Sequence, residues 1–169
     1  VSSAHPSQPP VSPAPSTTTS MNVRDFGAKG DGITDDFDAI YAAIQAAIFP
    51  GKTTRAVYFP AGVYLVRKTL PLYHYTSYYG DGIYATTVVI KPGVDAHVFA
   101  TARLPTSDVN AVWSYNVAIE NMKILGARGS GTSTGCGILI DGTGSKLSNL
   151  YVANCAEHGI WHKCTDQNG

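Results

Sequence analysis

The hydrophobic pattern is helical in only one segment of the chain. Residues 37–49, FDAIYAAIQAAIF, place on one face the apolar side chains of Phe37, Ile40, Tyr41, Ile44, Ala47 and Ile48. Thr34 is the expected N-cap, and Asp35, Asp36 and Asp38 add negative charge in the first turn, where the helix dipole favours it. Pro50-Gly51 ends the segment. The pattern predicts an amphipathic α-helix of about four turns.

Short runs of β-branched and aromatic residues fill most of the remaining chain. A strand over Met21 to Phe26 is expected before the helix. After it, RAVYFPAGVYLV predicts two strands around Pro60-Ala61-Gly62, and YTSYYGDG followed by TTVVIKPG repeats this arrangement. Further β-prone runs are VAIENMKILG, GILIDG, KLSNLYVANC and GIWHK.

The later runs form a weak repeat. IENMKILG at 119–126 and LSNLYVAN at 147–154 share the pattern apolar-x-Asn-apolar-x-apolar, which puts Asn121 and Asn149 in register. GILI at 137 and GIWH at 159 match in the same way, and the two offsets are 28 and 22 residues. Such a period is typical of one coil of a β-solenoid. Asparagines at equivalent places can hydrogen-bond from coil to coil.

The segment VRDFGAKGDGITDD, residues 23–36, is dense in turn residues and has two interpretations. In the architectural one, Gly27, Gly30 and Gly32 permit tight turns, and Asp31 or Asp35 accepts hydrogen bonds from nearby amides. In the functional one, carboxylates of residues 31, 35 and 36 bind Ca²⁺. EF-hand spacing is absent, so we favour the architectural interpretation and expect no metal site.

Charge and cysteine content exclude several classes. Twelve Lys and Arg balance twelve Asp and Glu, which argues against binding to nucleic acid or to a membrane surface. No run is long and apolar enough to span a bilayer, and no signal peptide is visible. Cys136, Cys155 and Cys164 lack a CxxC pair, so we expect buried thiols, a Cys155–Cys164 disulfide being the alternative.

The first twenty residues, VSSAHPSQPPVSPAPSTTTS, are rich in Pro, Ser and Thr. They cannot bury enough apolar surface to form a core, so residues 1–20 are expected to be a linker or an extended arm. The arm is either a disordered spacer or a tether to a larger assembly. Because the repeat stops part-way at Gly169, we expect residues 21–169 to be the N-terminal part of a longer domain.

Four segments carry a resemblance to a known family: VRDFGAKGDGITDD with its helix, VYFPAGVYLV, YYGDG and TVVIKP. Through them, residues 21–163 resemble the N-terminal part of the pectate-lyase-like superfamily. The resemblance implies an all-β solenoid, a right-handed parallel β-helix with an N-terminal capping α-helix. The superfamily includes polygalacturonase-type and exo-glucanase-type hydrolases, polysaccharide lyases and bacteriophage tailspikes. Its fold does not select one of these chemistries.

The Pro-rich arm favours, within this superfamily, a tailspike or receptor-binding protein that recognises or degrades host surface polysaccharide. The resemblance then implies a homotrimer in the virion tail or another extracellular place, with residues 1–20 contacting other virion tail proteins and no cofactor. A secreted polysaccharide hydrolase or lyase is the first alternative. A structural virion appendage without catalysis is the second.

The segment CAEHGIWHKCTD, residues 155–166, holds the candidate substrate-binding residues Glu157, His158, Trp161 and His162. If Ile160 points inward, Trp161 points outward beside polar groups that can hydrogen-bond sugar hydroxyls. The alternative is that Trp161 packs in the core or at a subunit contact.

No catalytic residue is assigned. The polygalacturonase-type series Asn-Thr-Asp, Asp-Asp, Gly-His-Gly and Arg-Ile-Lys is not present as a set, since the Asp35-Asp36 pair stands without the other three motifs. Catalytic groups are therefore expected beyond residue 169, and the 169-residue chain is expected to lack glycan-cleaving activity. Asp141-Gly142 is expected to be a turn. Tyrosines 73, 75, 78, 79 and 84 form a cluster along the sequence that could bind glycan or pack.

Overall fold

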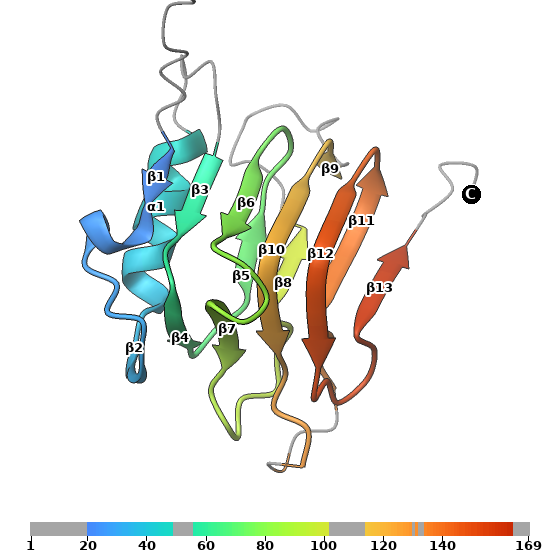
Figure 1. Ribbon diagram of the computed structural model, residues 1–169. Coiled ribbons are helices and arrows are strands. Elements are labelled where there is room, and N and C mark those ends of the chain that lie inside the picture. Colours follow the sequence, from blue (N-terminus) through green and yellow to red (C-terminus); the bar gives the residue numbers. More distant parts are fainter. Residues whose placement is uncertain (1–19, 49–55, 102–113, 130, 132–133, 164–169) are drawn as a thin grey trace, which may run out of the picture.

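The computed structural model describes residues 20–48, 56–101, 114–129, 131 and 134–163 (Figure 1). In chain order its elements are β1 (Met21–Asn22), η1 (Val23–Phe26), β2 (Asp31–Asp35), α1 (Phe37–Ile48), β3 (Ala56–Phe59), β4 (Gly62–Val66), β5 (Leu70–Leu72), β6 (Ser77–Gly80), β7 (Thr86–Ile90), β8 (Phe99–Thr101), β9 (Ser114–Tyr115), β10 (Ala118–Leu125), β11 (Ile138–Thr143), β12 (Lys146–Ala153) and β13 (Ile160–Lys163). The predicted arm, apart from residue 20, and Cys164 lie outside the described residues.

Two parallel sheets carry the fold. One has the order β1-β3-β6-β10-β7-β4-β2, with β12 beside β10, and the other has the order β13-β11-β8-β5, with β9 beside β11. Every recorded strand pair is parallel, and strands that are neighbours in a sheet come from successive passes of the chain. This arrangement confirms the predicted β-helix-like solenoid (Figure 1).

The long strand β10 spans two shorter strands of the preceding pass. Its first residues pair with β6 and its last residues pair with β7. Between them lies Asn121 at φ 56°, and the equivalent Asn149 of β12 has φ 48°. Asparagine tolerates this left-handed region better than most residues. Nδ2 of Asn149 donates to Oδ1 of Asn121 over 2.9 Å, which confirms the predicted contact from coil to coil.

The interior is filled by rows of apolar side chains in register. One row across the second sheet is Leu70, Phe99, Ile138 and Ile160. The first three are fully buried, whereas Ile160 on β13 is 45% exposed. Ile160 continues this row in register and so lies on the inward side of β13, which is the condition on which the outward placement of Trp161 depends.

The helix α1 packs against η1, β1, β3 and β5 at the opposite end of the solenoid from β13 (Figure 1). The residues on its buried face are Ile40, Ala43, Ile44, Ala47 and Ile48. Tyr41, predicted for this face, is exposed and stacks on half-buried Phe37 with 5.8 Å between ring centroids. Within the described ranges, no helix has the length and apolarity to cross a bilayer.

The prediction that Thr34 caps α1 is wrong, because the helix begins only at Phe37. Residues 31–35 form β2, which pairs with β4, and the Thr34 hydroxyl donates to Asp31 Oδ2 over 2.8 Å. Asp36 is the residue immediately before the helix, and its carbonyl accepts from the Ile40 amide over 3.0 Å. Oδ1 of Asp35 accepts from the Phe37 amide over 3.1 Å. Pairing with a neighbouring strand therefore decides where the helix starts.

The predicted strand over Met21 to Phe26 is correct only for its first two residues. Val23–Phe26 is a 3₁₀ turn, because Oδ1 of Asn22 accepts from the Arg24 amide over 3.0 Å and Gly27 at φ 103° closes the turn. A φ in this range favours glycine.

The acidic residues of the turn segment bind backbone amides. Asp36, only 2% exposed, accepts from the amides of Lys29 and Gly30 over 2.7 and 2.9 Å. Asp31 Oδ1 accepts from the amides of Ile33 and Thr34 over 2.9 and 2.7 Å. These hydrogen bonds support the architectural interpretation, because the carboxylates satisfy amides that the turns would otherwise leave unpaired.

Asp31→Asn is expected to weaken the acid dependence of stability. The amides of Thr34 and Ile33, followed by the Thr34 hydroxyl, stabilise the charged carboxylate and lower the pKa of Asp31 from 3.8 to about 2. Because the folded pKa is the lower one, the carboxylate stabilises the fold above the unfolded pKa, and this contribution is lost as the pH falls toward about 2. Near pH 5 the variant should melt at a lower temperature than wild type. Near pH 2 the two melting temperatures should be close to each other. An equal difference at both pH values contradicts the assignment.

Candidate functional site

The turns that precede β8, β11 and β13 stack on one another. His97, Cys136 and His158 each lie two residues before a member of the inward-facing row Phe99, Ile138 and Ile160, so they occupy equivalent places in successive coils. The Cys136 amide donates to Nδ1 of His97 over 2.9 Å, and burial lowers the pKa of His97. Backbone hydrogen bonds continue the stack, since the amide of Gly137 donates to the carbonyl of His158 over 3.1 Å.

Trp161 lies on the outward face of β13. Alternation along the strand places Trp161 outside, because its neighbour Ile160 faces the interior. The His158 ring lies 5.2 Å from the Trp161 ring, and Nζ of Lys163 lies 4.2 Å from the Trp161 ring centroid. Glu157 immediately precedes His158 in the chain and is exposed. We call Glu157, His158, Trp161 and Lys163 the Trp161 cluster.

Cys136 lies beneath this cluster. It is 1% exposed, and its Sγ is 3.9 Å from Oε2 of Glu157. Sγ of Cys136, a carboxylate oxygen of Glu157 and a ring nitrogen of His158 all lie within 4.8 Å of one another. Burial raises the pKa of the Cys136 thiol. The structure thus brings a buried thiol together with two of the predicted site residues.

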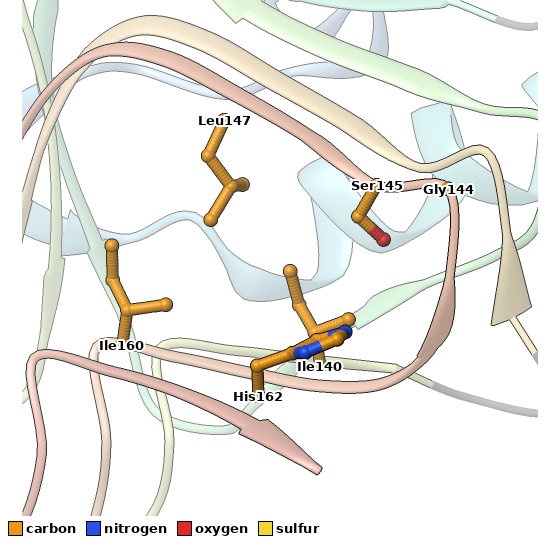
Figure 2. A pocket seen from close by; sticks show the side chains of 6 residues that line it. All are labelled: Ile140, Gly144, Ser145, Leu147, Ile160 and His162. Carbon is orange, nitrogen blue, oxygen red and sulfur yellow. The ribbon is translucent and has the colours of Figure 1, made fainter. Parts of the chain in front are cut away.

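His162 points to the other side of β13. It lines a pocket of about 420 Å³ together with Ile140, Gly144, Ser145, Leu147 and Ile160. Figure 2 shows His162 close to Ile140, with Leu147 and Ile160 across the pocket. Nε2 of His162 lies 2.8 Å from the carbonyl oxygen of Gly142. Of the four predicted residues, Glu157, His158 and the half-buried Trp161 therefore gather on one side of β13. His162 lies on the other side, where it faces the pocket and is exposed.

Cys136 and His97 were not identified as site residues from the sequence. For Cys136 the available signal is the coil period, since residue 136 precedes residue 158 by the same 22 residues that separate Ile138 from Ile160. His97 lies 39 residues before Cys136, so the period gives no such signal for it. The prediction that the cysteines are buried thiols is confirmed for Cys136. It is confirmed only in part for Cys155, which is half-buried. Both residues are free thiols.

The predicted tyrosine cluster does not form a single surface. Tyr73 and Tyr78 are buried, and burial raises the pKa of Tyr78. Tyr79 stacks on Tyr58 with 5.1 Å between ring centroids, while Tyr84 is 93% exposed. The five residues therefore divide between the core and separate parts of the surface.

The expected turn at Asp141-Gly142 is wrong, because both residues lie within β11. Asp141 pairs with Lys163 of β13, and Gly142 pairs with β9. Pairing with strands on both sides holds this segment extended.

Similarities to known proteins agree with this architecture. The family model described as "Rhamnogalacturonase A/epimerase, pectate lyase-like" matches residues 20–118. A glucan 1,3-beta-glucosidase of Cochliobolus carbonum is 27% identical over 186 aligned residues, which cover 85% of this chain and 24% of that protein.

Two solved structures resemble the chain over most of its length. ORF18 of Geobacillus virus E2 is 30% identical, has a TM-score of 0.66, and is matched over 83% of this chain and 27% of its own. The A-module of the mannuronan C-5 epimerase AlgE6 of Azotobacter vinelandii is 23% identical, with a TM-score of 0.65 and coverage of 84% and 40%.

The chain thus spans well under half the length of each of these three proteins. The family match covers more than half of the chain, and the parallel solenoid has the fold that this match implies. The chain belongs to the pectate-lyase-like rhamnogalacturonase A/epimerase family.

Proposed function

We propose that this chain forms the first coils of a virion tail β-helix protein that recognises host surface polysaccharide. The observation that carries the proposal is the similarity to ORF18 of Geobacillus virus E2, which is 30% identical over 83% of this chain. The surface available for recognition is the Trp161 cluster, which presents an aromatic ring beside a carboxylate, an imidazole and an ammonium group.

The proposed architecture is a right-handed coil with α1 as its cap. The buried face of α1 packs on β1, β3 and β5, and this is the contact by which a helix keeps the apolar end of a solenoid from water. The proposal also includes a homotrimer, with residues 1–20 as an arm that contacts other virion tail proteins and residues 21–169 as the N-terminal part of the β-helix domain.

The Trp161 cluster has the chemistry that sugar binding requires. A pyranose presents its apolar face to an aromatic ring and its hydroxyls to polar groups at the ring edge. In this cluster the Lys163 ammonium covers the Trp161 ring, held there by a cation–π contact. A bound sugar replaces Lys163 on the ring, and the ammonium, Glu157 and His158 then hydrogen-bond the hydroxyls.

Trp161→Ala is expected to lower polysaccharide affinity about tenfold or more, which corresponds to at least about 1.4 kcal/mol. The measurement is the affinity of the full chain for a panel of capsular, O-antigen and cell-wall polysaccharides, with a β-1,3-glucan and mannuronan included. Tyr84→Ala is the matched control, because it removes an exposed aromatic side chain outside the Trp161 cluster. The control should bind like wild type.

Two results overturn the assignment. If the full chain binds no polysaccharide of the panel, recognition by these coils is wrong. If Trp161→Ala and Tyr84→Ala bind as well as wild type, the chain binds glycan elsewhere and the Trp161 cluster is not the site.

A secreted polysaccharide hydrolase or lyase is the second candidate. It is favoured by the relative named glucan 1,3-beta-glucosidase, which aligns with 85% of this chain. Assays of reducing ends and unsaturated products on the complete protein separate the two candidates, since cleavage by a monomer supports the secreted enzyme.

A further inference from the structure

Three metal-ligating atoms of different chemistry meet at the turn before β13. Sγ of Cys136, a carboxylate oxygen of Glu157 and a ring nitrogen of His158 lie within 4.8 Å of one another. The Cys136 Sγ–Glu157 Oε2 distance is 3.9 Å. Neither the turn geometry nor polysaccharide binding requires a thiol at this place.

The backbone fixes the relative positions of these residues. The amide of Glu157 donates to the carbonyl of Gly135 over 3.2 Å, and the amide of Gly137 donates to the carbonyl of His158 over 3.1 Å. Cys136 is thus bracketed by hydrogen bonds between adjacent coils. On its other side, its own amide donates to Nδ1 of His97 over 2.9 Å. The spacing of the ligands follows from the stacking of coils and does not depend on a mobile segment.

The separations fit a small tetrahedral ion. With a Zn–S bond of about 2.3 Å and Zn–N or Zn–O bonds of about 2.0–2.2 Å, tetrahedral ligands lie roughly 3.3–3.8 Å apart. The observed 3.9 Å between Sγ and Oε2 is close to this range. Glu157 and His158 are exposed, so their side chains can close the remaining distance around the buried thiol.

The donor set selects the class of ion. A thiolate with an imidazole suits zinc and other late divalent transition metals, whereas Ca²⁺ and Mg²⁺ take oxygen ligands almost exclusively. A thiolate and a carboxylate also balance the two positive charges of the ion. Three protein ligands leave a fourth position, which is typical of zinc sites that hold water or an exogenous ligand.

We propose that Cys136, Glu157 and His158 form a three-ligand site for Zn²⁺, with the fourth position open beside Trp161. The site shares Glu157 and His158 with the Trp161 cluster, so bound Zn²⁺ would occupy two of the groups proposed for sugar hydroxyls. The site does not rest on polysaccharide recognition, because Zn²⁺ alone is its ligand. It also revises the sequence-based expectation that the chain has no metal site.

The test uses the full chain without an affinity tag, treated with chelator and then titrated with ZnCl₂ by calorimetry. One Zn²⁺ per chain is expected, and Co²⁺ in its place should give the near-ultraviolet charge-transfer absorption of a cobalt–thiolate bond. Cys136→Ser and His158→Gln should each weaken Zn²⁺ binding more than tenfold, and Cys136→Ser should remove the absorption band. Cys155→Ser is the matched control, because Sγ of Cys155 is directed to the carbonyl of Ala153 at 3.4 Å. It should bind Zn²⁺ like wild type.

Three results overturn the proposal: no Zn²⁺ uptake by the chelator-treated chain, a Co²⁺ complex without a thiolate band, or Zn²⁺ binding that survives Cys136→Ser. If Cys136→Ser fails to fold, as judged by circular dichroism, His158→Gln decides, because an exposed histidine can be replaced without disturbing the core. Unchanged Zn²⁺ affinity in that variant then rejects the site, whatever the outcome of the polysaccharide measurements.

Discussion

Ile44→Asp is expected to abolish cooperative folding of the chain. Ile44 is 0% exposed and lies on the face of α1 that packs against β1, β3 and β5. Loss of the apolar side chain alone costs about 2–5 kcal/mol, and an unpaired buried carboxylate adds several more. The sum is comparable to the whole stability of a typical domain, about 5–15 kcal/mol.

The matched control is Ala42→Asp, which introduces the same charge at an exposed position of α1. Thermal melts followed by circular dichroism should show a transition close to wild type for this control and none for Ile44→Asp. If both variants melt like wild type, α1 does not cover the end of the solenoid and the capping role is wrong.

Phe99→Ala is expected to destabilise the fold by about 3–5 kcal/mol. The Phe99 side chain is fully buried in the interior row of the second sheet. Its ring meets those of Phe59 and Tyr78 edge-on, with centroid distances of 6.4 and 6.2 Å. Alanine leaves a cavity where the second sheet packs on these two rings of the first sheet, and it also removes edge-to-face contacts worth about 0.5–1.5 kcal/mol each.

Urea unfolding of wild type, Phe99→Ala and Tyr84→Ala measures this loss. Tyr84→Ala removes a ring that is 93% exposed, so its change should stay within about 0.5 kcal/mol. A loss below about 1 kcal/mol for Phe99→Ala would show that the two sheets do not share one packed interior.

Features with a strong periodic signal could be predicted from the sequence. The helical face of α1 is correct at Ile40, Ile44, Ala47 and Ile48, because these positions depend on the 3.6-residue period alone. The contact between Asn121 and Asn149 follows from the repeat, since a solenoid brings equivalent positions of adjacent coils together.

Features set by partners distant in sequence were not predicted. Thr34 has the chemistry of an N-cap, but the pairing of β2 with β4 delays the helix to Phe37. Asp141-Gly142 has the composition of a turn, but partners in β9 and β13 keep it in β11. In both places contacts between coils override a local preference.

The same distinction applies to the candidate site. Glu157, His158 and Trp161 are neighbours in sequence, so a local pattern was sufficient to group them. His162 is also their neighbour in sequence, but alternation along β13 directs it to the pocket shown in Figure 2, on the other side of the strand. Cys136 joins them only through the stacking of coils, and that requires the register of β11 against β13.

The central claim, that these coils belong to a virion tail protein of the trimeric β-helix type, is tested most directly by the mass of the complete gene product in solution. Multi-angle light scattering at several protein concentrations gives this mass without a shape assumption. A trimer should give three times the subunit mass at every concentration. A monomer that cleaves polysaccharide would contradict the central claim and would make the secreted enzyme the correct assignment.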